Sequence, residues 1–87
     1  MKESLRESFK QLLLTLVKGL VEKPDQISIE VCEPTERGVT VYRLHVAPSD
    51  MGRVIGKQGR IAKAIRMVMR SSASRKRQKV AVEIAQE

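Results

Sequence analysis

The sequence predicts an α+β fold, a three-stranded mixed sheet with helices packed on one face, in the order α-β-β-α-α-β. Two periodicities support this fold class. Apolar residues recur at helical spacing near the N-terminus and again after residue 60, whereas three other stretches alternate apolar and polar residues as half-buried strands do. A chain of 87 residues is long enough for one hydrophobic core. We therefore expect a single domain over residues 1–87.

The first element is an amphipathic helix over residues 4–22. Ser4 followed by Glu7 has the spacing of a capping box, in which two side chains satisfy backbone N–H groups at a helix start. We expect the helix to end before Pro24, because proline disfavours the helical conformation in the residue that precedes it. Its apolar side chains share one broad face that should pack in the core: Leu5, Phe9, Leu12, Leu13, Leu16, Val17 and Leu20.

Residues 26–47 predict an antiparallel hairpin. Ile27, Ile29 and Val31 alternate with polar residues in the first strand, and a second strand rich in β-branched residues runs over 39–47. The turn at 34–38 contains Gly38, which can adopt a positive φ.

Residues 49–73 predict two helices joined by Gly56-Lys57-Gln58-Gly59. The short first helix begins after Pro48, with Ser49 or Asp50 as its N-cap, and the second runs from about residue 60 to 73. Residues 79–85 alternate again and form a third strand. Because two helices connect the second and third strands, these strands should be parallel neighbours with a right-handed crossover.

The formal net charge of +7 is concentrated in the second half of the chain. Residues 53–87 hold ten basic and two acidic side chains, and there is no carboxylate between Arg53 and Lys79. Such a surface favours a polyanionic partner, nucleic acid first and an acidic membrane surface second.

The sequence has few of the residues and motifs that several other functional classes need. Cys32 is the single cysteine, so it cannot form an internal disulfide, and with His45 as the single histidine both a zinc site and a positioned His/Cys catalytic pair are poorly supplied. No G-x-G-x-x-G or Walker motif is present. The leucine run at 12–14 is interrupted by Lys18 and lacks a cleavage site, and no apolar stretch is long enough to span a membrane. We expect a cytoplasmic, non-catalytic protein without cofactor, metal or membrane insertion.

The turn at Gly56–Gly59 can bind phosphate. Two glycines allow a tight backbone, the next helix directs free N–H groups outward, and Arg53, Lys57 and Arg60 add positive charge. The alternative is an ordinary helix-loop-helix turn in which the glycines serve geometry alone.

The helix after this turn carries a basic stripe of Arg60, Lys63, Arg66 and Arg70. A solvated face is the alternative to a binding surface. The apolar arc of the same helix is wider than one small sheet requires, and although core packing is expected for most of it, an association face is a second hypothesis. The candidate residues of that face are Ile61, Ala64, Ile65, Met67 and Val68.

At these residues the chain resembles a KH domain. The string Val54-Ile55-Gly56-Lys57-Gln58-Gly59 matches the VIGxxG core of that family, and Ile65 matches an apolar position in the following helix. The family pattern has isoleucine where this chain has Ala62, with Ile61 one residue earlier. The β-α-α-β unit behind an α-β extension is similar to the type II order, and VAPSDMGRVIGKQGR is similar to the centre of the KhpA (YlqC-like) family of small bacterial stand-alone KH proteins.

That resemblance implies a type II KH fold and binding of single-stranded RNA, with roles in RNA chaperoning and, in some bacteria, in cell elongation and cell-wall regulation. It implies pairing with itself, as a homodimer, or with a larger KH-containing protein of the KhpB (Jag/EloR) type. Gly56, Lys57, Gln58 and Gly59 would clamp the backbone of about four nucleotides, with Ile55 in the groove floor. Together with the charge pattern, this gives Arg53, Ile55, Gly56, Lys57, Gln58, Gly59, Arg60 and Lys63 as candidate RNA-binding residues, and Arg66, Arg70, Arg75, Lys76 and Arg77 as a secondary basic surface.

Two other functions stay open at this point. A helix-turn-helix would bind duplex DNA, although strands flank both helices here. A protein-interaction module would use the apolar helix face and keep the charge for solubility. Phe9 and Tyr42 are the only aromatic residues, so a platform for stacking bases is not expected.

Overall fold

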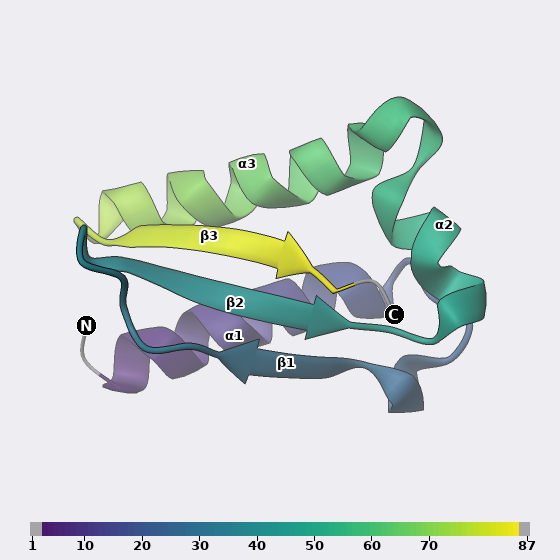
Figure 1. The fold of residues 1–87 in the computed structure, drawn as a ribbon, viewed down its shortest axis with the longest axis horizontal. Helices are drawn as coiled ribbons and strands as arrows, with labels where there is room; N and C mark the ends of the chain where they lie inside the picture. The colour runs from purple at the N-terminus through teal and green to yellow at the C-terminus, as the bar shows by residue number, and fades with distance from the viewer. Residues whose placement is uncertain (1–2, 86–87) are drawn as a thin grey trace.

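The sheet has three strands in the order β1-β2-β3. In the computed structural model, which describes residues 3–85, these are β1 (Ser28–Val31), β2 (Val39–His45) and β3 (Lys79–Ile84). β1 and β2 are antiparallel, whereas β2 and β3 are parallel, with Tyr42 beside Val82 (Figure 1). The α+β class, the mixed sheet and the parallel pairing across the two-helix connection are confirmed.

Two long helices, α1 (Glu3–Lys18) and α3 (Arg60–Arg75), cover the same face of the sheet (Figure 1). The short helix α2 (Met51–Ile55) precedes α3. Single 3₁₀ turns occupy Pro24–Gln26, Pro48–Asp50 and Lys57–Gly59.

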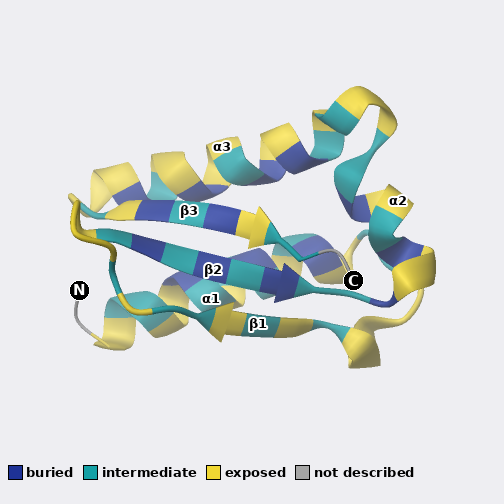
Figure 2. Ribbon diagram, viewed as in Figure 1, coloured by how far each residue is buried: buried dark blue, intermediate teal, exposed yellow. Residues whose placement is uncertain are grey.

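The core lies between these helices and the sheet (Figure 2). Along β2, side chains point alternately to the two faces, so Thr40, Tyr42 and Leu44 are buried against the helices. Leu13 of α1 and Met69 of α3 fill the space above them. The opposite face of the sheet carries no helix of the described residues, and Arg43 there forms ion pairs with Glu30 of β1 (3.3 Å) and Glu83 of β3 (3.2 Å).

The N-terminal half differs from the expected boundaries. α1 ends at Lys18 rather than at residue 22, because the chain turns at Gly19, where the Leu20 N–H donates to the Val17 carbonyl (2.9 Å). Pro24 starts a 3₁₀ turn instead of stopping a helix. α1 already includes Glu3, so Ser4 is not its N-cap. The hairpin was expected over residues 26–47. β1 begins at Ser28 and β2 ends at His45, so the strands occupy less of the chain than expected.

The C-terminal half differs less. α3 continues past residue 73 to Arg75 and ends in a Schellman motif. In this motif the Gln78 N–H donates to the Ala73 carbonyl (2.9 Å) and the Arg77 N–H to the Ser74 carbonyl (3.0 Å). Arg77 adopts the left-handed conformation (φ 58°) that glycine usually supplies here. β3 ends at Ile84, one residue before the expected end.

Candidate nucleic-acid interface

Two glycines shape the loop Gly56–Gly59 between α2 and α3, which we call the GKQG loop. Gly56 has φ 75°, and a Cβ there would lie 2.6 Å from Cγ1 of Ile61. Gly59 has φ 74° with open space where its Cβ would be. A side chain is strained at both positions, and at Gly56 it also collides with α3. Glycine at both ends therefore lets the loop take this course without strain.

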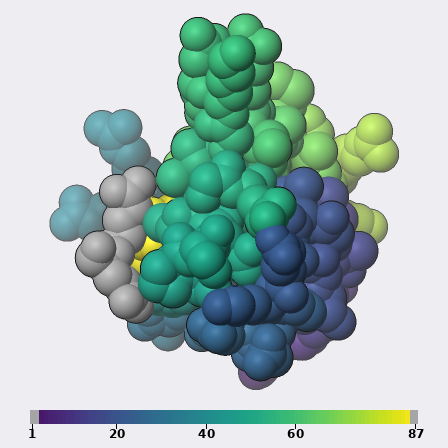
Figure 3. Space-filling model, turned by 90° about the vertical axis from the view of Figure 1, so that its right-hand side faces the viewer, coloured from purple at the N-terminus to yellow at the C-terminus, as the bar shows by residue number. Residues whose placement is uncertain are grey.

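The tip of the GKQG loop is open to solvent. Lys57 and Gln58 are exposed, and the green segment that contains the loop projects from the rest of the molecule in Figure 3. Arg60 Nη2 donates to Gln58 Oε1 (3.1 Å), which holds the side chains of the loop and the start of α3 together. The positive end of the α3 dipole lies at the same place. Polar backbone, an amide side chain and positive charge are thus presented on one protruding turn.

The basic stripe of α3 continues from this loop. Lys57, Arg60, Lys63 and Arg70 are exposed, and within residues 3–85 none of them forms an ion pair with a carboxylate. At the far end of α3, Arg75, Lys76 and Arg77 are exposed as well. The helix therefore carries cations from one end to the other.

Arg53 is the exception among the predicted RNA-binding residues. Its guanidinium forms ion pairs with Glu22 and with Asp50, the latter at 3.3 Å from Nε to Oδ1. Two carboxylates balance its charge, so its role differs from that of the unpaired cations of the loop and of α3.

Asp50 stands at the N-cap position of α2, one of the two positions expected, but its carboxylate binds distant segments instead of capping that helix. It is 1% exposed and makes no side-chain cap at α2; its two oxygens accept the backbone N–H groups of Glu22 (3.1 Å) and Lys23 (3.0 Å). The hydrogen bond from Glu22 lowers the pKa of this carboxyl below its usual value, burial opposes that shift, and the Lys23 N–H and the Arg53 charge add to it. Local spacing could not identify these partners, because they precede Asp50 by 28 and 27 residues.

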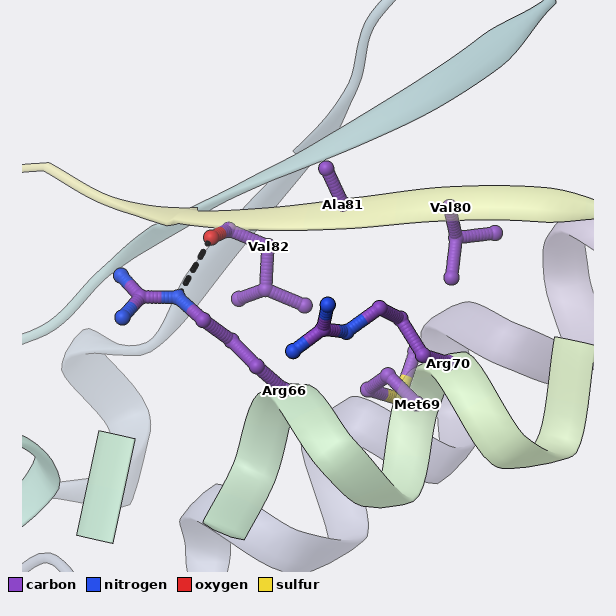
Figure 4. A pocket seen from close by; sticks show the side chains of 6 residues that line it. All are labelled: Arg66, Met69, Arg70, Val80, Ala81 and Val82. Atoms are coloured by element: carbon purple, nitrogen blue, oxygen red, sulfur yellow. Dashed lines mark hydrogen bonds between the residues drawn. The ribbon is translucent and has the colours of Figure 1, made fainter. Parts of the chain in front are cut away.

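A groove runs between α3 and the free edge of β3 (Figure 4). It encloses about 330 Å³ and is lined by Arg66, Met69, Arg70, Val80, Ala81 and Val82. Arg66 Nε donates to the Val82 carbonyl (3.1 Å) across it. The β3 residues were missed from the sequence because their alternation predicts only a core strand. The signal that could have found them is topological, since a last strand parallel to β2 has one unpaired edge.

The aromatic residues take no part in this surface. Phe9 and Tyr42 are 5% and 0% exposed, and burial raises the pKa of the Tyr42 hydroxyl. Neither ring is therefore exposed for stacking on a base.

The predicted association face is smaller than expected. Ile65 is 4% exposed and belongs to the core, and Ile61 packs beneath Gly56. Ala64, Met67 and Val68 remain on the outer face of α3, with Met67 65% exposed. Ala62, between Ile61 and Lys63, is buried in the core.

Residues 3–85 contain neither a metal-binding cluster nor a membrane-spanning helix. No cluster of His, Cys, Asp and Glu there could hold a metal ion. No helix in that range is both long and apolar enough to cross a membrane.

Comparison with known proteins gives concordant matches. Three curated relatives, each named RNA-binding protein KhpA, come from Clostridium acetobutylicum (52% identity), Listeria monocytogenes (47%) and Chlamydia trachomatis (42%). The alignments cover 85–90% of this chain and 95–97% of those proteins.

The fold is similar to part of Era from Aquifex aeolicus, with a TM-score of 0.66 and 21% identity over 92% of this chain and 30% of Era. A second Era structure, in complex with a segment of 16S ribosomal RNA, gives a TM-score of 0.63 at 20% identity over 87% of this chain and 28% of that one. The family model described as KhpA/KhpB, KH domain matches residues 10–84. The chain therefore belongs to the KhpA/KhpB family of KH-domain proteins.

Proposed function

We propose that this protein binds single-stranded RNA without catalysing a reaction, and acts as a cytoplasmic RNA chaperone or post-transcriptional regulator, linked to cell elongation or cell-wall regulation. The observation that carries the proposal is the continuity of the GKQG loop, the unpaired cations of α3 and the groove at β3. A polyanion is attracted along this whole path, because no carboxylate lies between residues 53 and 79. The curated relatives are named RNA-binding proteins, which supports the RNA-binding part of this proposal.

In this proposal the loop holds phosphates and the groove holds bases. The backbone at Gly56 and Gly59 lets a phosphate approach closely, while Lys57, Arg60 and Lys63 supply charge. Gln58 contributes an amide that can donate or accept. Ile55, half-buried at the end of α2, supplies apolar floor beside the loop. Arg53 acts differently, by fixing the start of α2 through Asp50.

The test replaces the exposed tip of the loop. Lys57→Asp/Gln58→Asp should abolish binding of a single-stranded RNA pool, because it puts two negative charges where phosphates would lie. Thr15→Asp/Lys18→Asp on α1 makes the same change in net charge at two exposed positions outside the groove and should retain binding. Fluorescence anisotropy at fixed salt measures both variants. Binding that survives the loop substitution would refute the site.

A duplex DNA competitor in the same titration separates RNA binding from a helix-turn-helix activity. We expect single-stranded RNA to be bound more tightly than duplex DNA at equal salt, because a loop that clamps a backbone needs unpaired, splayed bases. Preference for the duplex would favour the helix-turn-helix alternative.

Association is a second proposed function, favoured by the outer face of α3. Met67 and Val68 are 65% and 40% exposed next to Ala64, which leaves an apolar strip on an otherwise basic helix. We propose that this strip pairs with a second copy of the chain or with a KhpB-type KH protein. Met67→Asp should convert a dimer to a monomer in sedimentation equilibrium while the fold, monitored by circular dichroism, stays intact. A wild-type chain that sediments as a monomer and does not bind a KhpB-type protein would contradict this proposal.

A further inference from the structure

The unpaired edge of β3 presents backbone groups to the groove. The Ala85 N–H donates to the Leu44 carbonyl (2.9 Å), so alternate residues of this segment direct their backbone groups toward β2. Val80, Val82 and Ile84 fall between them and direct theirs to the free edge. A ligand that enters the groove beside Val82 would therefore meet one N–H and one carbonyl of the main chain.

Arg66 changes which hydrogen-bonding groups the free edge of β3 presents to a ligand. Its Nε–H donates to the Val82 carbonyl (3.1 Å), which engages one of the two lone pairs of this acceptor. The terminal N–H groups of the guanidinium stay available, and Figure 4 shows Arg66 and Arg70 both reaching from α3 toward β3. Around Val82 the groove therefore holds several N–H donors from Arg66 and Arg70, and Arg66 already donates to the Val82 carbonyl.

The floor beneath these donors is apolar. Met69 and Val82 are buried below the groove, and no carboxylate lines it. A flat ring with acceptors on its edge fits this combination, since the ring covers the apolar floor while the edge receives the N–H groups. Guanine offers two adjacent acceptors, O6 and N7, whereas adenine and cytosine present amino donors at the corresponding position.

We propose that Arg66 determines base specificity in this groove, by donating to the Val82 carbonyl and directing its remaining N–H groups at acceptor-rich bases, guanine foremost. The inference rests on the proposed binding of single-stranded RNA and adds to it a chemical preference at one subsite. Adenine and cytosine are disfavoured because their amino groups would face the N–H donors of the guanidinium groups.

The experiment uses the full chain and seven-nucleotide oligouridines with one central guest nucleotide, guanine, adenine or cytosine. Fluorescence anisotropy gives the affinity for each guest, and the ratio between guests is the measured quantity. The wild type should bind the guanine guest tightest. Arg66→Met should reduce the guanine-to-adenine preference by about 5- to 10-fold, the low end of what a bidentate arginine–guanine contact contributes.

Two further variants separate specificity from charge and from folding. Lys63→Met removes the same charge from an exposed position of α3 that does not line the groove, so it should weaken all three oligonucleotides equally. Arg66→Lys keeps the charge but loses the planar fork, and it should lose the guanine preference with little loss of overall affinity. Thermal melting by circular dichroism verifies that each variant is folded.

The outcomes distinguish this inference from the proposed function. A wild type that binds all guests equally, or prefers adenine or cytosine, overturns the role of Arg66 while leaving RNA binding intact. The same holds if Arg66→Met and Lys63→Met weaken every guest by one factor. If the loop variant Lys57→Asp/Gln58→Asp binds RNA as tightly as the wild type, the proposed site itself fails, and the subsite fails with it.

Discussion

At Gly56 two independent constraints meet in one residue. Its φ of 75° disfavours any side chain, and a Cβ would lie 2.6 Å from Cγ1 of Ile61. Gly59 has only the first constraint, with nothing within 4 Å of its Cβ position. Gly56→Ala should therefore lower the free energy of unfolding by about 2–4 kcal/mol, and Gly59→Ala by about 1–2 kcal/mol. Urea denaturation of the two variants, extrapolated to water, measures the difference.

The comparison between these glycines is its own control. Both substitutions add one methyl group at a positive φ in the same loop, so the excess loss at Gly56 reports the contact with α3. Equal losses would mean that Ile61 moves aside without penalty and that the loop is not packed against α3 at this point.

The lowered pKa of Asp50 should make the fold less stable at acidic pH. Its pKa is lowered by the hydrogen bond from Glu22 and, with burial opposing, by Lys23 and Arg53. A carboxylate of lowered pKa stabilises the fold above its unfolded-state pKa, about pH 4, and that contribution is lost as the pH falls through the folded-state value. Asp50→Asn leaves one buried N–H without an acceptor, so its Tm at pH 7 should be lower by about 5 °C or more.

The difference in Tm between wild type and Asp50→Asn should shrink as the pH is lowered below about 4, because both chains then carry a neutral group at this position. Calorimetry from pH 7 to pH 2.5 measures it. A difference that stays constant over this range would contradict an ionised carboxylate at Asp50.

At the scale of the element, α3 has one face that packs in the core and another face that is exposed. Met69 is 0% exposed in the core and Met67, two residues earlier, is 65% exposed. Met69→Ala should lower the free energy of unfolding by about 2–5 kcal/mol, whereas Met67→Ala should change it by less than about 0.5 kcal/mol. Urea denaturation at protein concentrations where the chain is monomeric measures both values. A large loss at Met67 under those conditions would mean that this side chain packs against the fold of the single chain.

The elements themselves were predictable because their periodicities are strong. The parallel pairing of β2 with β3 follows from the two helices between them, and the structure has it. Element ends were less predictable, since they depend on backbone geometry. α1 ends at Lys18, before Gly19, although its apolar spacing continues to Leu20. α3 passes through three serines and ends at Arg75 in a Schellman motif.

The candidate site was predictable only as far as its local pattern extends. The glycines and basic residues of the GKQG loop and α3 lie within a few residues of one another, so spacing alone identifies them. Asp50 accepts hydrogen bonds from Glu22 and Lys23, which are 28 and 27 residues away. Arg66 donates to Val82, which is 16 residues away. Contacts of this kind arise when elements pack, and neither spacing nor charge indicates them.

At the scale of the molecule, charge is arranged along one axis. The GKQG loop and the turn at Arg75–Arg77 lie at opposite ends of α3, a 16-residue helix, which corresponds to about 24 Å. Acidic residues are kept on the other elements, where Glu30 and Glu83 pair with Arg43 and Glu22 pairs with Arg53. The fold thus leaves a chain of unpaired cations beside the groove.

This arrangement predicts how RNA affinity responds to salt. If about three to five phosphates contact the loop and α3, the logarithm of the binding constant should fall with the logarithm of salt concentration with a slope of about −2 to −3.5. Lys57→Gln removes one such contact and should make the slope shallower by about 0.7, whereas Lys18→Gln at the end of α1 should leave it unchanged. Titrations of a single-stranded RNA at four salt concentrations measure the slopes. An affinity that does not depend on salt would contradict a site built on phosphate contacts, because counterions released from the RNA backbone are the source of the effect.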